Sequence, residues 1–189
     1  MYINKKFMAA IALSAVTLAA CSNDDGANNT SSATNGGEVQ TTAEEKIVMD
    51  QAGTEVTIPG QVDSIVSGGI LPYFHTWYVA TNSTKEIVAM HPNSYNAAEN
   101  SMLAKLSPDV LNASTDFVKN GETNIEELMK LNADVYFELS TNEKTIEQAR
   151  AAGITTVGIK AIDAAAAEPL ATFNSWLELT GQIANTTER

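Results

Sequence analysis

The clearest pattern of hydrophobic and polar positions lies in residues 121–140, GETNIEELMKLNADVYFELS. Ile125, Leu128 and Leu131 recur at three-residue spacing, which predicts a short amphipathic helix with one apolar face. The segment 134–139 follows almost at once and has the length and the β-branched and aromatic content of a buried strand. A helix that leads directly into a strand is half of a β-α-β unit, so this stretch indicates an α/β domain.

Polar residues mark both ends of this helix. Thr123 or Asn124 can serve as the N-cap, and Glu126 or Glu127, three residues later, can close a capping box. Asn132 is a stop signal before the strand. The helix is therefore expected to be bounded by local hydrogen bonds at its start and by a turn residue at its end.

Further strands and helices are predicted on both sides of this stretch. Short strands at 46–49 and 55–58 flank a turn in which Gly53 can adopt a positive φ, which predicts a β-hairpin. Pro72 suits the first position of the next helix. The other strands are expected at 62–67, 86–90 and 155–159, and the other helices at 73–81, 97–106, 142–152 and 169–189. Alternating strands and helices predict a three-layer, Rossmann-like α/β lobe on a mostly parallel sheet, preceded by the hairpin and followed by a long C-terminal helix.

The first twenty residues have the pattern of an export signal. Lys5 and Lys6 precede an apolar run at 7–20, which is too short to span a bilayer comfortably. The run ends in Leu-Ala-Ala followed by Cys21, the pattern of a lipoprotein signal-peptidase site. Cys21 is the only cysteine, so an internal disulfide is excluded. We therefore expect a signal peptide at 1–20 and acyl chains on Cys21, which together anchor a protein firmly to a membrane.

Composition separates a tether from the folded part of the chain. Residues 21–45 are rich in Ser, Asn, Thr and Gly, and they lack the large apolar side chains that offset the entropy of ordering, so a flexible tether is expected there. The α/β lobe is expected at 46–168 and the start of a long helix at 169–189. With 44% hydrophobic residues among 189, the chain is long enough for one domain with a hydrophobic core.

The expected mature chain is strongly acidic. Removal of residues 1–20 takes away two lysines and leaves nine basic against 23 acidic side chains, a net charge of about −14. Such a charge argues against nucleic acid and against an anionic membrane surface as direct partners.

Catalytic motifs are missing from the sequence. Gly68 and Gly69 follow a predicted strand, but neither a G-x-G-x-x-G fingerprint nor a P-loop lysine follows, and there is no G-x-S-x-G or H-E-x-x-H motif. One cysteine, assigned to lipid, leaves none for Cys/His catalysis or a thiolate metal site. The two histidines lie in different loops and cannot make a three-imidazole metal site. We therefore expect a protein that is not an enzyme, without catalytic residues, a directly bound metal or an intrinsic cofactor.

In an open parallel sheet, ligands bind beyond the carboxyl ends of the strands. The loops expected there are 68–75, 91–95, 140–142 and 160–163, and the first two are rich in aromatic and imidazole groups. Such groups suit a large, partly apolar, planar or chelated ligand. For the aromatic side chains, above all Phe74 and Trp77, packing onto the sheet is the alternative, and for His91 it is a loop hydrogen bond. The residues expected to contact a ligand are Leu71, Pro72, Tyr73, His75, His91 and Tyr95.

Two segments carry a resemblance to a known family. The segment 124–135 is similar to the pattern N-[IL]-E-x-[LI]-x-x-L-x-P-D-[VL]-[VI] of the periplasmic-type substrate-binding proteins of ABC importers for iron–siderophores, haem and cobalamin. The matching residues are Asn124, Ile125, Glu126, Leu128, Leu131, Asp134 and Val135, while Ala133 replaces the usual proline. The hairpin also resembles the family's entry pattern D-x-x-G-x-x-V-x-[IL]-P, with matches at Asp50, Gly53, Val56, Ile58 and Pro59. Two matches in the right order, about seventy residues apart, are more specific than either alone.

The resemblance runs from residue 46 to residue 189, whereas full members of this family have a second α/β lobe after a long connecting helix. It implies that this chain holds the N-terminal lobe and half of the ligand cleft. We therefore expect the sequence to be a truncated record that ends inside the connecting helix.

The resemblance also assigns a role to Glu126. In related proteins the glutamate at this position lies on the exposed rim of the lobe and docks against arginines of the permease. The alternative is that Glu126 only stabilises the helix N-terminus, although Glu127 can fill that role from the N3 position.

The function implied by the resemblance is binding and delivery. The protein is expected to be lipid-anchored at an extracytoplasmic membrane surface, to capture a ferric siderophore and to deliver it to the permease and ATPase subunits of an ABC importer. Haem is the second ligand considered, with Tyr73, His75, His91 or Tyr95 as axial ligands, and a corrinoid is the third. The alternative from another class is a surface lipoprotein that acts as a protein-interaction module.

Overall fold

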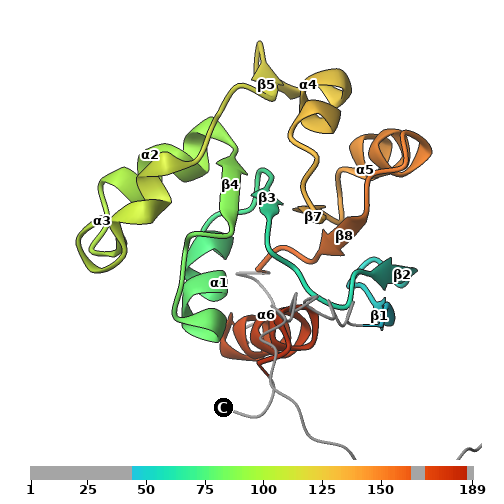
Figure 1. Ribbon diagram of the computed structural model, residues 1–189, viewed down its shortest axis with the longest axis horizontal. Helices are drawn as coiled ribbons and strands as arrows, with labels where there is room; N and C mark the ends of the chain where they lie inside the picture. The colour runs from blue at the N-terminus through green and yellow to red at the C-terminus, as the bar shows by residue number, and fades with distance from the viewer. Residues whose placement is uncertain (1–43, 163–168, 187–189) are drawn as a thin grey trace, which may run out of the picture. The chain divides into compact units, whose positions relative to one another are not determined.

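The computed structural model describes residues 44–162 and 169–186. The predicted signal peptide, Cys21 and all of the predicted tether except residues 44 and 45 lie outside the described residues. The central element is a sheet of four parallel strands in the order β4-β3-β7-β8 (Figure 1). The strands are β3 (Ile65–Ser67), β4 (Ile87–Met90), β7 (Val135–Leu139) and β8 (Thr156–Ile159).

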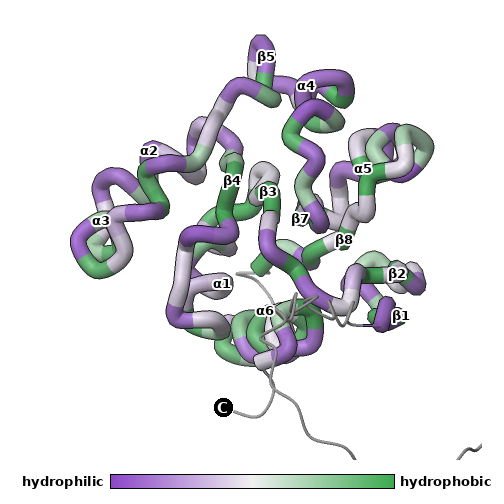
Figure 2. The backbone as a smooth tube through the Cα atoms, in the orientation of Figure 1, coloured by the Kyte–Doolittle hydropathy of each residue, from purple (hydrophilic) through white to green (hydrophobic). Residues whose placement is uncertain are grey.

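Helices cover both faces of this sheet. On one face, α1 (Tyr73–Thr81) and α6 (Pro169–Ala184) pack together against one hydrophobic cluster, and on the other α4 (Ile125–Lys130) and α5 (Glu143–Ala151) pack against a second cluster. Alternation along a strand explains the division, since Phe137 belongs to the first cluster and its neighbour Tyr136 to the second. Figure 2 shows β3 and β4 as hydrophobic segments between more polar loops. The predicted three-layer α/β lobe is confirmed.

The first core strand begins at Ile65, three residues later than predicted. The reason is Asp134, whose Oδ2 accepts hydrogen bonds from the amides of Asp63 and Ser64, both at 2.8 Å. These amides are therefore satisfied by a side chain instead of by a neighbouring strand. The aspartate of the family-like segment thus joins the start of β3 to the start of β7.

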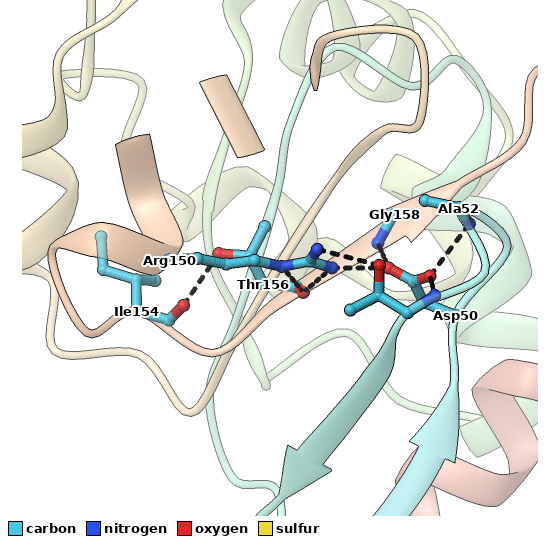
Figure 3. Close-up of polar contacts among 7 residues, drawn as sticks. Asp50, Ala52, Arg150, Ile154, Thr156 and Gly158 are labelled. Atoms are coloured by element: carbon cyan, nitrogen blue, oxygen red, sulfur yellow. Dashed lines mark hydrogen bonds and ion pairs between the residues drawn. The ribbon is translucent and has the colours of Figure 1, made fainter. Parts of the chain in front are cut away.

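The predicted N-terminal hairpin has the expected bounds, β1 (Lys46–Met49) and β2 (Glu55–Ile58). Its turn is held against β8 by the fully buried carboxylate of Asp50, which lies 2.6 Å from Arg150 Nη2 (Figure 3). The same carboxylate accepts hydrogen bonds from the amides of Ala52, Thr54 and Gly158 at 2.8 to 3.0 Å. Because both oxygens are satisfied, this buried charge fixes the hairpin to the sheet.

A single helix at 97–106 was predicted, and this prediction is wrong. The structure has two shorter helices, α2 (Pro92–Glu99) and α3 (Leu103–Leu106), followed by the 3₁₀ helix η1 (Pro108–Asn112). His91 and Pro92 start α2 early, because His91 Nδ1 accepts the amide of Asn93 and Pro92 occupies a first-turn position. Ser101 then separates the helices, since its hydroxyl bonds to the carbonyl of Ala98 and accepts the amide of Leu103.

A second hairpin, β5 (Val118–Lys119) and β6 (Glu122–Thr123), was not predicted. Its turn consists of Asn120 and Gly121, with φ of 54° and 84°. Positive φ at both central residues is what a two-residue hairpin turn of type I′ requires. The hairpin leads directly into α4, which is capped by Asn124 as predicted.

The C-terminal helix α6 is fastened to the lobe at several points. Lys46 Nζ donates to the carbonyl of Ile183 at 2.9 Å, Gln51 Nε2 donates to Ser175 Oγ at 3.0 Å, and the hydroxyls of Tyr73 and Thr180 are 2.8 Å apart. Trp176 and Leu179 of this helix are buried, whereas Leu170 in its first turn is 75% exposed. None of the helices in the described part of the chain has the length and hydropathy needed to cross a bilayer.

Candidate ligand-binding site

A hollow of about 240 Å³ lies at the carboxyl edge of the parallel sheet. It is formed by the residues that follow β3, β4 and β7, by the first turns of α5 and by the turn and second strand of the β5–β6 hairpin, and we call it the carboxyl-edge hollow. The described residues that line it are glycines and polar or charged residues: Gly69, His91, Gly121, Glu122, Thr123, Glu138, Asn142, Lys144, Thr145 and Gln148. This is the edge at which a ligand is predicted from the sequence, but among the described residues no aliphatic, Phe, Tyr or Trp side chain lines it.

Glu138 is the buried polar group of this hollow. It lies at the fourth position of β7 and is only 2% exposed. Its Oε1 accepts the amide of Leu139 at 2.7 Å and Asn142 Nδ2 at 3.0 Å, and its Oε2 accepts the hydroxyl of Tyr136. The carboxylate therefore ties the end of β7 to the residue that precedes α5.

The network continues from Glu138 to the β5–β6 hairpin. The hydroxyl of Tyr136 lies 3.4 Å from Thr123 Oγ1, and the Tyr136 ring packs edge-on against Phe117. Burial and the neighbouring charge of Glu138 raise the pKa of the Tyr136 phenol, so the hydroxyl remains a donor. The hairpin and the sheet edge are thus joined by a chain of hydroxyl and carboxylate contacts.

Gly68 and Gly69 lie next to this carboxylate, and Gly69 lines the hollow. A Cβ on Gly68 would lie 2.7 Å from both Glu138 Oε2 and the carbonyl oxygen of Phe137, while the nearest neighbour of a Cβ on Gly69 would be Glu138 Oε1 at 3.8 Å. The close approach at Gly68 requires glycine, whereas Gly69 has ordinary space. In the sequence this pair resembles only an incomplete nucleotide-binding motif.

His91 is the predicted contact residue that lines the hollow. Its backbone amide donates to the carbonyl of Ser67, which fixes it beside the end of β3. Its Nδ1 accepts the amide of Asn93 at 3.2 Å, so in the neutral imidazole the proton is on Nε2. The loop hydrogen bond through Nδ1 is therefore present, and no other described residue bonds to Nε2, so the predicted ligand contact through Nε2 stays a prediction.

The structure places Tyr73 in the core. Its side chain is fully buried, its hydroxyl contacts Thr180, and its ring lies 4.7 Å from that of Phe137 and 6.0 Å from that of Trp176. Burial also raises the pKa of its phenol. Tyr73 therefore packs α1 between the sheet and α6 and has no surface to offer a ligand. Phe74 and Trp77 are buried as well, in line with the packing alternative.

The other predicted contact residues lie outside the hollow. Leu71 is 49% exposed and Pro72 is exposed, joined to it by a cis peptide bond. His75 is half-buried against the ring of Phe74, and burial lowers the pKa of its imidazole. Tyr95 donates its hydroxyl to the carbonyl of Leu111 and lines a separate groove beside α2. The loops that follow the strands of this sheet edge therefore do not all contribute side chains to the carboxyl-edge hollow.

Several residues of the hollow were not identified from the sequence. Two signals were available. Glu138 is a charge inside an otherwise apolar strand, and Asn120-Gly121 is a strong short-range hairpin signal. Asn142, Lys144 and Thr145 gave no such signal, because their place depends on how α5 packs beside β7.

Glu126 is exposed in the first turn of α4. Asn124 Oδ1 accepts the amide of Glu127 at 3.0 Å, and Glu127 forms an ion pair with Lys130. The reciprocal arm of the predicted capping box is not formed, because the amide of Asn124 donates to the carbonyl of Phe117. Among the described residues, the Glu126 carboxylate takes part in no hydrogen bond or ion pair.

This chain is similar to solved structures of solute-binding proteins. A periplasmic solute-binding protein from Veillonella parvula matches 77% of this chain with 28% sequence identity and a TM-score of 0.68. This chain has the fold of a periplasmic solute-binding protein. The match covers 42% of the Veillonella protein, so the chain spans less than half the length of that relative.

Two more distant structures share the solute-binding-protein fold. The Haemophilus influenzae molybdate-binding protein MolA, solved with molybdate, has 22% identity and a TM-score of 0.59, with 76% of this chain and 47% of MolA covered. The haem-binding protein HmuT has 16% identity and a TM-score of 0.51, with coverage of 77% and 44%. No protein-family model matches the chain, and no match was found among curated proteins. The resemblance noted from the sequence is confirmed, since these neighbours are a periplasmic solute-binding protein, the molybdate-binding protein of an ABC transporter and a haem-binding protein.

Proposed function

We propose that this protein is the substrate-binding component of an ABC importer and acts outside the cytoplasm. The observation that carries the proposal is the carboxyl-edge hollow, an open polar site at the end of a parallel sheet, on a chain with the solute-binding-protein fold. The protein binds its ligand there and presents it to a permease, without chemistry.

The proposed ligand is a ferric siderophore. A hollow lined by an imidazole, a hydroxyl, amides and carboxylates favours an oxygen-rich, hydrophilic chelate. A porphyrin or a corrin needs flat apolar surface, which Tyr73, Phe74 and Trp77 do not supply because they are buried in the core. Haem remains the second candidate on one observation, the free Nε2 of His91 at the hollow.

The test is a titration of the intact protein with ferric trihydroxamate and ferric tricatecholate chelates, haemin and cobalamin. Trp176 is a suitable reporter, because its indole Nε1 donates to the carbonyl of Lys160 in the loop that follows β8. We expect saturable quenching by a ferric chelate, weakened at least about tenfold by His91→Ala if Nε2 contacts the ligand. If haemin bound with a shift of its Soret band, and if His91→Ala abolished that shift, the proposed ligand would be haem instead of a siderophore.

Absence of saturable binding by every one of these compounds would contradict the importer proposal and favour the protein-interaction module. A matched control is Tyr95→Phe, which alters a predicted contact residue outside the hollow and is expected to leave chelate binding unchanged.

The proposed localisation of the protein is based on its N-terminal sequence. We propose that Cys21 carries the lipid that holds the lobe at an extracytoplasmic membrane surface. Metabolic labelling with a palmitate analogue is expected to mark the wild type but not Cys21→Ser, and the variant is expected to leave the membrane fraction. Equal membrane retention of both would contradict the anchor.

A further inference from the structure

Among the residues that the structure describes, the buried carboxylate of Glu138 has no cationic partner. The described residues contain two carboxylates in ion pairs, Asp50 with Arg150 and Glu127 with Lys130, and Glu138 is in neither pair. Asp50 and Glu138 are buried to a similar extent, at 4% and 2% exposed, yet only Asp50 meets a guanidinium. Buried charges in proteins are normally paired or bound to a ligand, so the missing partner of Glu138 needs an explanation.

The neighbours of Glu138 leave acceptor capacity open. Tyr136, Leu139 and Asn142 supply one neutral donor each, whereas an ionised carboxylate has about four acceptor positions. Oε1 already accepts two donors and Oε2 accepts only the Tyr136 hydroxyl, so the open acceptor position is on Oε2. The carboxylate lines the hollow, and Gly68, on which a Cβ would lie 2.7 Å from Oε2, places no side chain against this oxygen. A donor that enters the hollow is therefore expected to meet Oε2 without displacing a protein group.

The other charges at the hollow do not neutralise Glu138. Lys144 and Glu122 also line it, but both are exposed, so water and salt screen them, and their charges offset each other. His91 presents an Nε2–H donor when neutral. The net field deep in the hollow is therefore that of one buried carboxylate.

We propose that the carboxyl-edge hollow binds a cationic, hydrogen-bond-donating group of the ligand, an ammonium or a guanidinium, with Glu138 as its counter-ion. This inference rests on the proposed function, because it names the chemistry of the ligand at the same site. It selects, among ferric chelates, those that carry a free amine, and it disfavours anionic chelates.

The first test uses small probes and does not depend on iron. Butylammonium, butyramide and butyrate are titrated into the isotope-labelled protein, and the backbone amides of Gly69, Leu139 and Asn142 are followed by NMR. We expect chemical-shift changes with butylammonium but not with butyramide or butyrate. In Glu138→Gln the affinity for butylammonium is expected to fall about tenfold. In this variant the new amide can donate to Tyr136 while the remaining oxygen accepts Leu139 and Asn142, so the fold is expected to be retained. Glu147→Gln, which removes an exposed carboxylate of α5 outside the lining of the hollow, is the matched control and is expected to change the affinity little.

The second test compares a ferric trihydroxamate that has a free terminal ammonium with its N-acetylated form. We expect the ammonium form to bind about 10- to 100-fold more tightly, and Glu138→Gln to remove this difference. Equal binding of both chelates would overturn the inference and leave the importer proposal standing. If butylammonium shifted the amides specifically but no chelate bound, the importer proposal would be contradicted and the ammonium site would stand. If butyrate shifted the amides instead of butylammonium, the inference would be overturned, and this outcome does not require that Glu138→Gln folds.

Discussion

At the scale of single residues, the packing of β7 and of the Glu138 carboxylate against the loop after β3 depends on the space at Gly68. The backbone of β7 and the Glu138 carboxylate occupy the positions that a side chain at residue 68 would need, and neither can move without breaking hydrogen bonds. We predict that Gly68→Ala lowers the free energy of unfolding by about 1–3 kcal/mol, because an extra methyl group overpacks the site. Urea unfolding followed by circular dichroism measures the change.

Gly69→Ala is the control for this prediction, since its Cβ meets nothing closer than 3.8 Å. A change below about 0.5 kcal/mol is expected there, as for substitutions without a steric cause. Equal stability losses at 68 and 69 would show that the close approach at Gly68 is not what constrains this packing.

The buried pair of Asp50 and Arg150 decides how the first hairpin is held. Removal of the carboxylate leaves Arg150, which is 29% exposed at its side chain, without its partner and leaves the buried amide of Gly158 without an acceptor. Asp50→Ala is therefore predicted to lower the free energy of unfolding by about 3 kcal/mol. Glu55→Ala in the same hairpin removes an exposed carboxylate and should change it by less than about 0.5 kcal/mol. A smaller loss for Asp50→Ala than for Glu55→Ala would contradict the role of the pair.

At the scale of elements, α4 is a six-residue helix that depends on its cap. Such a short helix is not stable by propensity, so the hydrogen bond from the Glu127 amide to Asn124 Oδ1 and the burial of Leu128 hold it in place. Asn124→Ala is predicted to cost about 1 kcal/mol in the free energy of unfolding, while Asn124→Asp, which keeps the acceptor, is expected to cost little. Thermal and urea unfolding of the two variants measure the difference, and equal losses would exclude capping as the cause.

At the scale of the whole molecule, the proposed delivery step is a contact with another protein. Glu126 is exposed on α4, next to the hairpin that lines the hollow, and is free to pair with a permease arginine. Glu126→Lys is predicted to reduce import of the ferric chelate at least about tenfold while leaving chelate affinity unchanged. Uptake of a radioactive iron chelate by cells, together with a binding titration of the purified protein, measures both quantities.

Glu99→Lys makes the same change of charge at an exposed position of α2 and is the control for net charge. Import is expected to survive that substitution. If Glu126→Lys and Glu99→Lys gave the same import rate, the proposed docking role of Glu126 would be withdrawn.

The two hairpins show what could be predicted at the scale of elements. Both depend on local signals, a turn glycine and flanking β-branched residues. The one at 46–58 was found with correct bounds, whereas Asn120-Gly121 was overlooked although the signal was present. The prediction of one helix at 97–106 was wrong for another reason. The Ser101 hydroxyl bonds to backbone groups on both sides of it, and these local hydrogen bonds replace those of a continuous helix between α2 and α3.

The sequence by itself determined the α/β alternation and the bounds of β1, β2 and α1, because each depends on residues within a few positions of one another. The order of strands and loops also predicted the sheet edge at which the site proposed for a ligand, the carboxyl-edge hollow, lies. Only the tertiary structure decided which side chains face that site. Tyr73 is buried because Thr180, 107 positions later, meets its hydroxyl, and Glu138 faces the hollow because β7 lies beside β3. Contacts of this kind join residues that have no common local pattern, so hydrophobic periodicity cannot reveal them.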